Sequence, residues 1–141
     1  MSELTLKDIS DAMKGIDICM MTTDNGRLES RPMSNNRDVE YDGDSYFFAD
    51  ASEEVVRDIN EQPQVNLAFV HEPALVGNSL YISVSGDADL VRDKAEMQKH
   101  WTPDLDAWFK DGVDTPGVTM IHVKANSIRY WKGRDQGTVT I

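Results

Sequence analysis

Short runs of apolar residues, many of them alternating with polar ones, recur along the chain and predict a protein built mainly of β-strands. Strands are expected over residues 17–23, 27–35, 65–70, 80–91, 117–124 and 127–131, with a further hairpin over 39–50. No internal repeat and no linker interrupts this pattern, so residues 1–141 are expected to form a single domain with a polar tail after residue 132.

Turn residues indicate how these strands pair. The Asn-Gly dipeptide at 25–26 is a strong hairpin signal, and Asp-Gly-Asp at 42–44 predicts a second hairpin whose return arm holds the aromatic residues 46–48. Pro32 has no N–H to donate, so its strand is expected at a sheet edge or at a bulge. The strand that contains Gly86 is expected to bend there.

Helical patterns are short and lie between the strands. Helices are expected over residues 4–14, 52–62, 93–100 and 104–110, the last two joined at Thr102-Pro103. Thr5 with Asp8 forms a variant of the capping box, Ser52 is expected to cap the second helix, and Pro63 to end it. Because hairpin-like connections come first and crossover helices do not follow each strand, the chain is expected to be mainly β, an antiparallel barrel with helical inserts.

Composition and charge narrow the possible functions. The chain is 40% hydrophobic and 28% charged, as in ordinary globular proteins, and has no apolar run long enough to cross a bilayer. Its start lacks the pattern of a signal peptide, so a cytoplasmic location is expected. A net charge of −11 argues against binding to nucleic acid or to an anionic membrane, which need a basic face.

Common catalytic signatures do not occur in the chain. There is no phosphate-binding Gly-rich loop and no Gly-x-Ser-x-Gly motif. Cys19 stands alone in an apolar run and is expected to be a small buried hydrophobe. His71, His100 and His122 lack metal-ligand spacing, so no metal site is expected. His122 alternates with apolar neighbours and faces either inward or a partner subunit.

A set of short motifs occurs in a specific order between residues 16 and 131. These are Ser-Arg-Pro-Met at 30–33, Phe-Phe-x-Asp at 47–50, Ser-Val-Ser-Gly at 83–86, Trp-x-Pro at 101–103 and Trp-Phe at 108–109. In this order the chain resembles general stress protein 26 and its relatives, the pyridoxamine 5′-phosphate oxidase-like flavin-binding split barrels. The resemblance implies an antiparallel split β-barrel and a homodimer with two flavins, FMN first and FAD next, in clefts between the subunits.

The resemblance also implies which residues contact the flavin. They are Ser30, Arg31, Pro32, Met33, Phe48, Ala49, Asp50, Ser52, Trp101 and Trp108. Residues 30–33 would contact the ring or the ribityl chain, and residues 48–52 would approach the ribityl-phosphate side. The two tryptophans would come near the ring in the other half of the site. This fits flavin chemistry, which needs planar apolar contacts, donors for the ring edge and N–H groups or cations for the phosphate.

These residues are also compatible with roles that involve no ligand. Arg31 alone is compatible with an ordinary surface arginine, and Trp101 and Trp108 are compatible with core anchors. Relatives usually carry a lysine near the start of the helix that precedes Pro63, where this chain has Val55 with Glu54 beside it. Arg31, Arg37 or a basic residue of the partner chain would then replace the lysine, or the flavin binds weakly or as a dinucleotide, or the pocket has lost it.

Three functions therefore remain open from the sequence. The first is a redox-active flavin protein, an oxidoreductase, in which no side chain stands out as a general base. The second is a non-catalytic flavin carrier. The third is a cofactor-free dimeric barrel that binds another small molecule, which Glu54 and Val55 favour.

Overall fold

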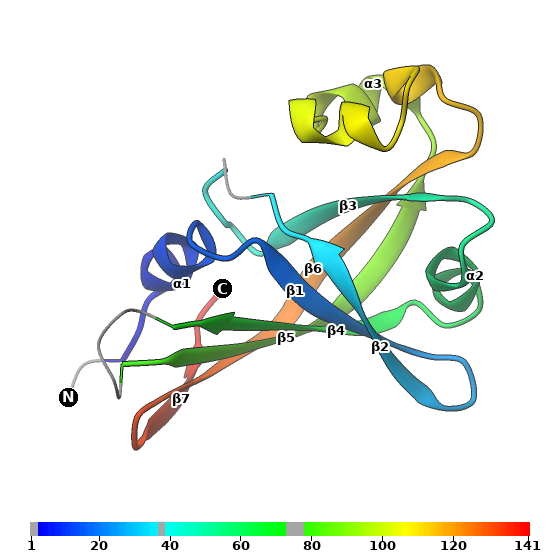
Figure 1. Ribbon diagram of the computed structural model, residues 1–141. Coiled ribbons are helices and arrows are strands. Elements are labelled where there is room, and N and C mark those ends of the chain that lie inside the picture. Colours follow the sequence, from blue (N-terminus) through cyan, green and yellow to red (C-terminus); the bar gives the residue numbers. More distant parts are fainter. Residues whose placement is uncertain (1–2, 37–38, 73–77) are drawn as a thin grey trace.

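The computed structural model describes residues 3–36, 39–72 and 78–141 (Figure 1). Its elements, in chain order, are α1 (Leu6–Met13), β1 (Ile18–Asp24), β2 (Leu28–Ser34), β3 (Asp44–Asp50), α2 (Glu54–Glu61), β4 (Gln64–His71), β5 (Leu80–Val91), α3 (Lys94–Lys99), the 3₁₀ helices η1 (Pro103–Ala107) and η2 (Gly112–Asp114), β6 (Val118–Lys132) and β7 (Asp135–Val139). The loop expected through Pro73 and Gly77 lies outside the described residues.

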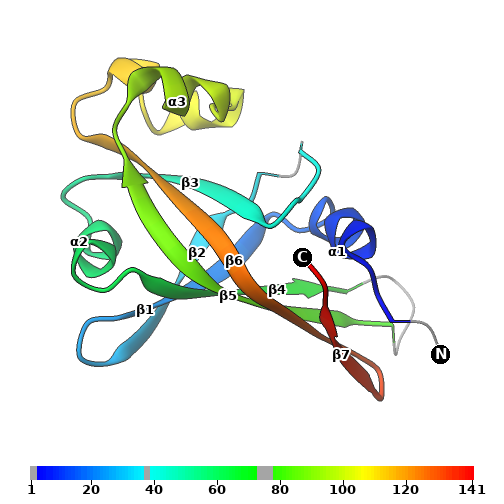
Figure 2. The same cartoon turned by 180° about the vertical axis from the view of Figure 1, so that it is seen from behind.

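The strands of the described chain form one antiparallel sheet in the order β2-β1-β4-β5-β6-β3, with β7 pairing with β6. β6 pairs with β5 along its length, with β3 through its first half and with β7 through its second half. The sheet curls around its apolar side, and α2 and the helical insert, residues 94–114, lie near one end (Figures 1 and 2). The expected antiparallel split barrel with short helical inserts is confirmed.

Local signals place several elements correctly. Thr5 caps α1 in a capping box, in which the Asp8 N–H donates to Thr5 Oγ1 (3.3 Å) and the Thr5 N–H donates to Asp8 Oδ2 (2.8 Å). β1 and β2 form the hairpin around Gly26, and β2, which holds Pro32, is an edge strand.

The bend expected at Gly86 is a β-bulge. Ser85 pairs with Ser127 and Gly86 with Ala125, so Asn126 is the extra residue in β6. The carbonyl oxygen of Lys124 lies only 2.3 Å from where a Cβ on Gly86 would be. Glycine is required at this position by the close approach of the two strand backbones.

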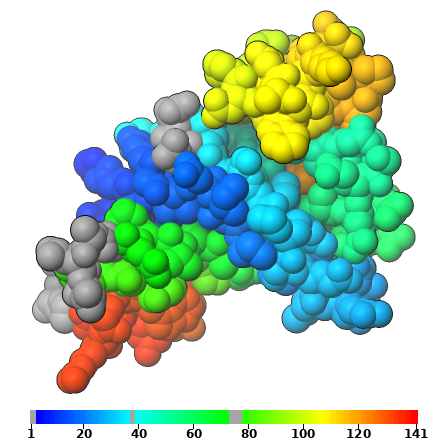
Figure 3. All heavy atoms as spheres, viewed as in Figure 1, coloured from blue at the N-terminus to red at the C-terminus, as the bar shows by residue number. Residues whose placement is uncertain are grey.

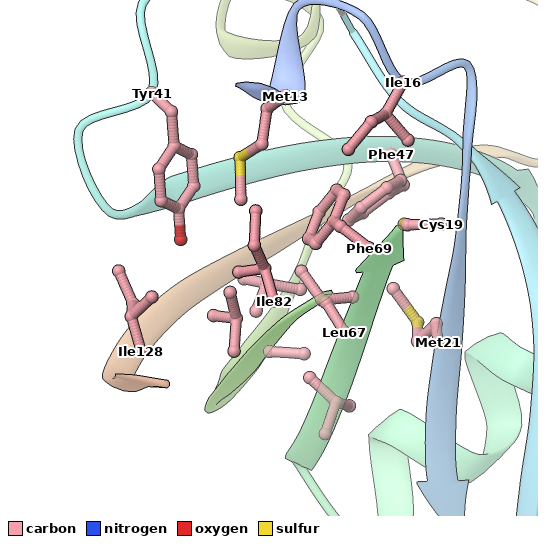
Figure 4. Packing of buried hydrophobic residues seen from close by; sticks show 14 of the residues in the cluster. Met13, Ile16, Cys19, Met21, Tyr41, Phe47, Leu67, Phe69, Ile82 and Ile128 are labelled. Carbon is pink, nitrogen blue, oxygen red and sulfur yellow. The ribbon is translucent and has the colours of Figure 1, made fainter. Parts of the chain in front are cut away.

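The core lies inside the curled sheet and is closed by α1. Met21, Leu67 and Phe69 point into it from β1 and β4, and Met13 reaches it from α1 (Figure 4). Cys19 is part of this core, as expected, and burial raises the pKa of its thiol to about 12. The thiol therefore stays protonated at neutral pH.

The hairpin expected over 39–50 does not form. Only residues 44–50 are a strand, β3, and it pairs with β6 instead of with the segment before it. That segment is held by α1, because the Tyr41 N–H donates to Ser10 Oγ (2.8 Å) and Ser10 Oγ donates to Glu40 Oε2 (3.0 Å). Hydrogen bonds to the side chain of Ser10 in α1 therefore take the place of the strand pairing that Asp-Gly-Asp at 42–44 predicted.

Two further expectations are corrected. Ser52 does not cap α2; Glu53 is the N-cap residue and makes no side-chain capping bond. The strands expected over 117–124 and 127–131 are one strand, β6, because the bulge at Asn126 bends the ladder without breaking it. The polar tail forms β7, in which Gly137 faces Tyr130 across the pair. Within the described part of the chain, no helix has both the length and the apolar character to span a membrane.

Candidate functional site

A cleft of about 620 Å³ opens between the helical insert and the sheet, next to the start of α2. The space-filling view shows the surface hollowed between the yellow residues of the insert and the teal residues of α2 (Figure 3). The cleft is lined by residues 17–18, 31–36, 46–49, 53–55, 100, 102, 104–105 and 108–109. Of the residues expected at the site, it brings together Arg31, Pro32, Met33, Phe48, Ala49 and Trp108.

The insert side of the cleft is aromatic. Trp101 packs edge-on against Phe48, with ring centroids 4.9 Å apart, and against Phe109 at 5.7 Å. Its Nε1–H donates to Asp106 Oδ1 (3.0 Å), so Trp101 anchors the insert and is not among the cleft-lining residues. Trp108, in contrast, lines the cleft and is 80% exposed. An exposed tryptophan beside a hollow offers a large planar surface to a ligand.

Arg31 belongs to a buried polar network under α2. Its Nη1 donates to Thr23 Oγ1 (2.7 Å), and its Nη2 lies 3.2 Å from Asp58 Oδ2. Thr23 Oγ1 in turn donates to Asp58 Oδ2 (2.8 Å). The side chains of Arg31 and Asp58 are only 20% and 6% exposed, so the guanidinium charge is balanced within the protein. Asp58 was not expected at the site from the sequence, although an acidic residue on the apolar face of α2 is a pattern that could have indicated it.

Three other expected contacts lie away from the cleft walls. Ser30 faces the opposite side of β2 from Arg31, and its Oγ bonds Thr22 Oγ1 (2.6 Å). Asp50 and Ser52 close the turn between β3 and α2, where Asp50 Oδ2 accepts hydrogen bonds from the Ser52 N–H and Oγ–H. Both bonds lower the pKa of the Asp50 carboxyl, and the bond from the Ser52 hydroxyl has the larger effect. Arg37 lies outside the described residues.

A stack of three rings borders the cleft and was not expected from the sequence. Tyr46 lies between His100, at a centroid distance of 3.5 Å, and His122, at 4.8 Å. His122 Nε2 is 2.9 Å from Asp44 Oδ1, so His122 is hydrogen-bonded within its own chain, on the face of β6 opposite to the core residues Ile121 and Val123. Tyr46 and His100 line the cleft. Burial, partly opposed by Glu96, lowers the pKa of His100 below 6.5, which favours a neutral imidazole at pH 7.

We expect this depressed pKa of His100 to make the protein less stable as the pH falls. The unfolded chain binds the proton more readily than the folded one, so stability is lost from about pH 6.5 downward through the folded-state pKa. His100→Phe keeps a ring to stack on Tyr46 and removes the proton site. Comparing Tm at pH 7.5 and pH 5.5 should show a smaller acid-induced fall in the variant than in the wild type; equal falls would refute this role.

Comparison with known families decides the classification. A family model described as "Pyridoxamine 5′-phosphate oxidase like" matches residues 5–141. The chain belongs to the pyridoxamine 5′-phosphate oxidase-like family. A curated relative, Protein bli-3 of Neurospora crassa, is 29% identical over 136 residues, covering 89% of this chain, and the chain spans 63% of that protein's length.

Solved structures of similar fold include general stress proteins. A Clostridium acetobutylicum protein related to general stress protein 26 is 18% identical, with a TM-score of 0.78 and coverage of 96% of this chain and 94% of its own. The general stress FMN/FAD binding protein of Xanthomonas citri is 21% identical, with a TM-score of 0.76 and the same coverages, 96% and 94%. At these identities the likeness shows that this family member shares their fold.

Proposed function

We propose that the cleft binds a flavin by its tricyclic ring. The observation that carries this proposal is the exposed indole of Trp108 beside a cleft of about 620 Å³. This volume falls within the range of about 300–1,000 Å³ that small-molecule sites have. The general stress FMN/FAD binding protein of Xanthomonas citri, which has the same fold, supports the choice of ligand class.

The residues of the cleft fit the ring of a flavin. Met33, Phe48 and Ala49 supply apolar contacts from the two edge strands, and Trp108 would cover the ring from the insert. Ser34 and Thr102 line the same cleft, and their side chains carry hydroxyl groups of the kind that can hydrogen-bond the polar edge of the ring. A bound flavin supplies hydride and electron transfer, and the protein's task is to orient it and to limit its contact with water.

A second copy of the chain is the partner we propose for this site. Ile18 and Met20 on β1 are exposed, and Pro32, the strand partner of Met20, lies beside them at the edge of the sheet. This apolar strip adjoins the cleft, because Ile18 and Pro32 also line it. A homodimer would cover the strip and close the open side of the cleft, which is the arrangement that the family resemblance implies.

Oxidoreductase activity belongs to this proposal as a separate step. Turnover of NADH or NADPH by the flavin-loaded protein would support an enzyme, whereas bound flavin without turnover with donors and common oxidants would support a carrier. The cofactor-free alternative predicts that no flavin binds at all.

Titration with riboflavin tests the proposal, with quenching of flavin fluorescence as the measurement. We expect saturable binding to the wild type and about tenfold weaker binding to Trp108→Ala, because stacking on an aromatic side chain contributes about 1–3 kcal/mol. Trp131→Ala is the matched control: Trp131 is also exposed but lies outside the cleft, under the Arg129 guanidinium. Absence of binding by the wild type would reject the proposed function.

A further inference from the structure

Acidic side chains outnumber basic ones in the described lining of the cleft. Glu53, Glu54 and Asp104 contribute carboxylates to its lining. Glu53 Oε2 accepts a hydrogen bond from the Asp50 N–H (2.7 Å), and Glu54 Oε1 accepts one from Asn25 Nδ2 (3.3 Å). Both donors are neutral, so these bonds hold the carboxylates in place without cancelling their charge.

The basic residues of the described lining do not offset these carboxylates. Arg31 is already paired with Asp58, so a second anion would have to compete with a buried carboxylate for the guanidinium. The lowered pKa of His100 leaves this side chain mostly neutral at pH 7. The N-terminus of a helix attracts anions, but the first turn of α2 presents the carboxylate of Glu54 and the buried, apolar Val55 instead of a basic side chain.

We infer that the cleft selects flavins without a charged phosphate, so that it binds riboflavin in preference to FMN and FAD. This inference rests on the proposed function, since it concerns which flavin the ring site accepts. A phosphate monoester carries a charge of about −1.5 to −2 at pH 7, and FAD carries a diphosphate. Beside the start of α2 such a group meets the carboxylates of Glu53 and Glu54, in surroundings that screen them less than bulk water does. The neutral ribityl chain of riboflavin meets no such repulsion.

Parallel titrations of riboflavin and FMN test the selectivity. At an ionic strength of about 0.02 M we expect the wild type to bind riboflavin about tenfold more tightly than FMN, and at about 0.5 M we expect the ratio to approach one, because salt screens the repulsion. Glu54→Lys should lower the ratio of FMN to riboflavin dissociation constants about tenfold at low salt. Glu61→Lys, at the exposed end of the same helix, changes the total charge equally outside the cleft and should alter the ratio less than about twofold.

The outcomes separate the two proposals. FMN binding as tightly as riboflavin or more tightly, in the wild type at low salt, would overturn the selectivity while supporting flavin binding. Equal effects of Glu54→Lys and Glu61→Lys on the ratio would also overturn it, since total charge and not the cleft would then be responsible. Failure of both flavins to bind would overturn the proposed function, and the selectivity with it.

Discussion

Replacing Asp58 by alanine is expected to lower the free energy of unfolding by about 3–5 kcal/mol. The carboxylate of Asp58 is the partner of the Arg31 guanidinium, at 3.2 Å, and accepts a hydrogen bond from Thr23 Oγ1 at 2.8 Å. Removing it leaves a cation in surroundings that water reaches poorly. Because typical domains are stable by only about 5–15 kcal/mol, this loss is a large part of the total.

Urea denaturation of Asp58→Ala measures this loss, and Asp11→Ala is its control. Asp11 forms an ion pair with Lys7 at 3.4 Å, but both side chains are exposed, so the expected change is below about 0.5 kcal/mol. If Asp58→Ala cost less than about 1 kcal/mol, the Arg31 charge would not depend on Asp58, and the guanidinium would be available to an anion in the cleft. That result would also weaken the case for selection against phosphate.

The second large effect is expected for Gly86→Ala, which should cost about 3 kcal/mol or more. The added Cβ would lie 2.3 Å from the Lys124 carbonyl oxygen and 3.2 Å from the Ala125 Cα. Both are backbone atoms of β6, so the clash cannot be relieved by turning a side chain. The strands β5 and β6 must separate at the bulge, and this bulge lies in the longest pairing of the sheet.

Chemical denaturation checks this effect against Ser85→Ala, the neighbouring position on the same strand. Ser85 is exposed and accepts a hydrogen bond from Asn66 Nδ2, which also donates to Ser83 Oγ, so its loss should cost less than about 0.5 kcal/mol. A similar stability for both variants would mean that β5 and β6 adjust their separation freely, contrary to the packing seen at the bulge.

The parts of the fold that the sequence predicts well are those set by local chemistry. Thr5 and Asp8 cap a helix through bonds three residues apart, and Pro32 excludes its strand from the sheet interior wherever that strand pairs. The hairpin expected over 39–50, which does not form, and the unexpected strand β7 both depend on partners far along the chain. Tyr41 is held by Ser10, and β7 finds its ladder on β6, neither of which a turn pattern reveals.

In the candidate site too, local motifs indicate some residues, whereas contacts between distant residues could not be predicted. Arg31, Phe48 and Trp108 were expected from a motif and do line one cleft. The motif does not reveal that the guanidinium of Arg31 forms an ion pair with Asp58, a residue that lies far along the chain in α2. The stacking of Tyr46 on His100 was equally hidden, because it joins β3 to the residue that ends α3. Pairings between distant side chains determine which charges remain for a ligand.

A crystal structure of the protein grown with riboflavin tests the central claim most directly. The account predicts the tricyclic ring in the cleft, against Phe48 and under Trp108, with a second copy of the chain closing the open side. A ring bound elsewhere, or a cleft that stays without ligand at saturating riboflavin, would contradict it.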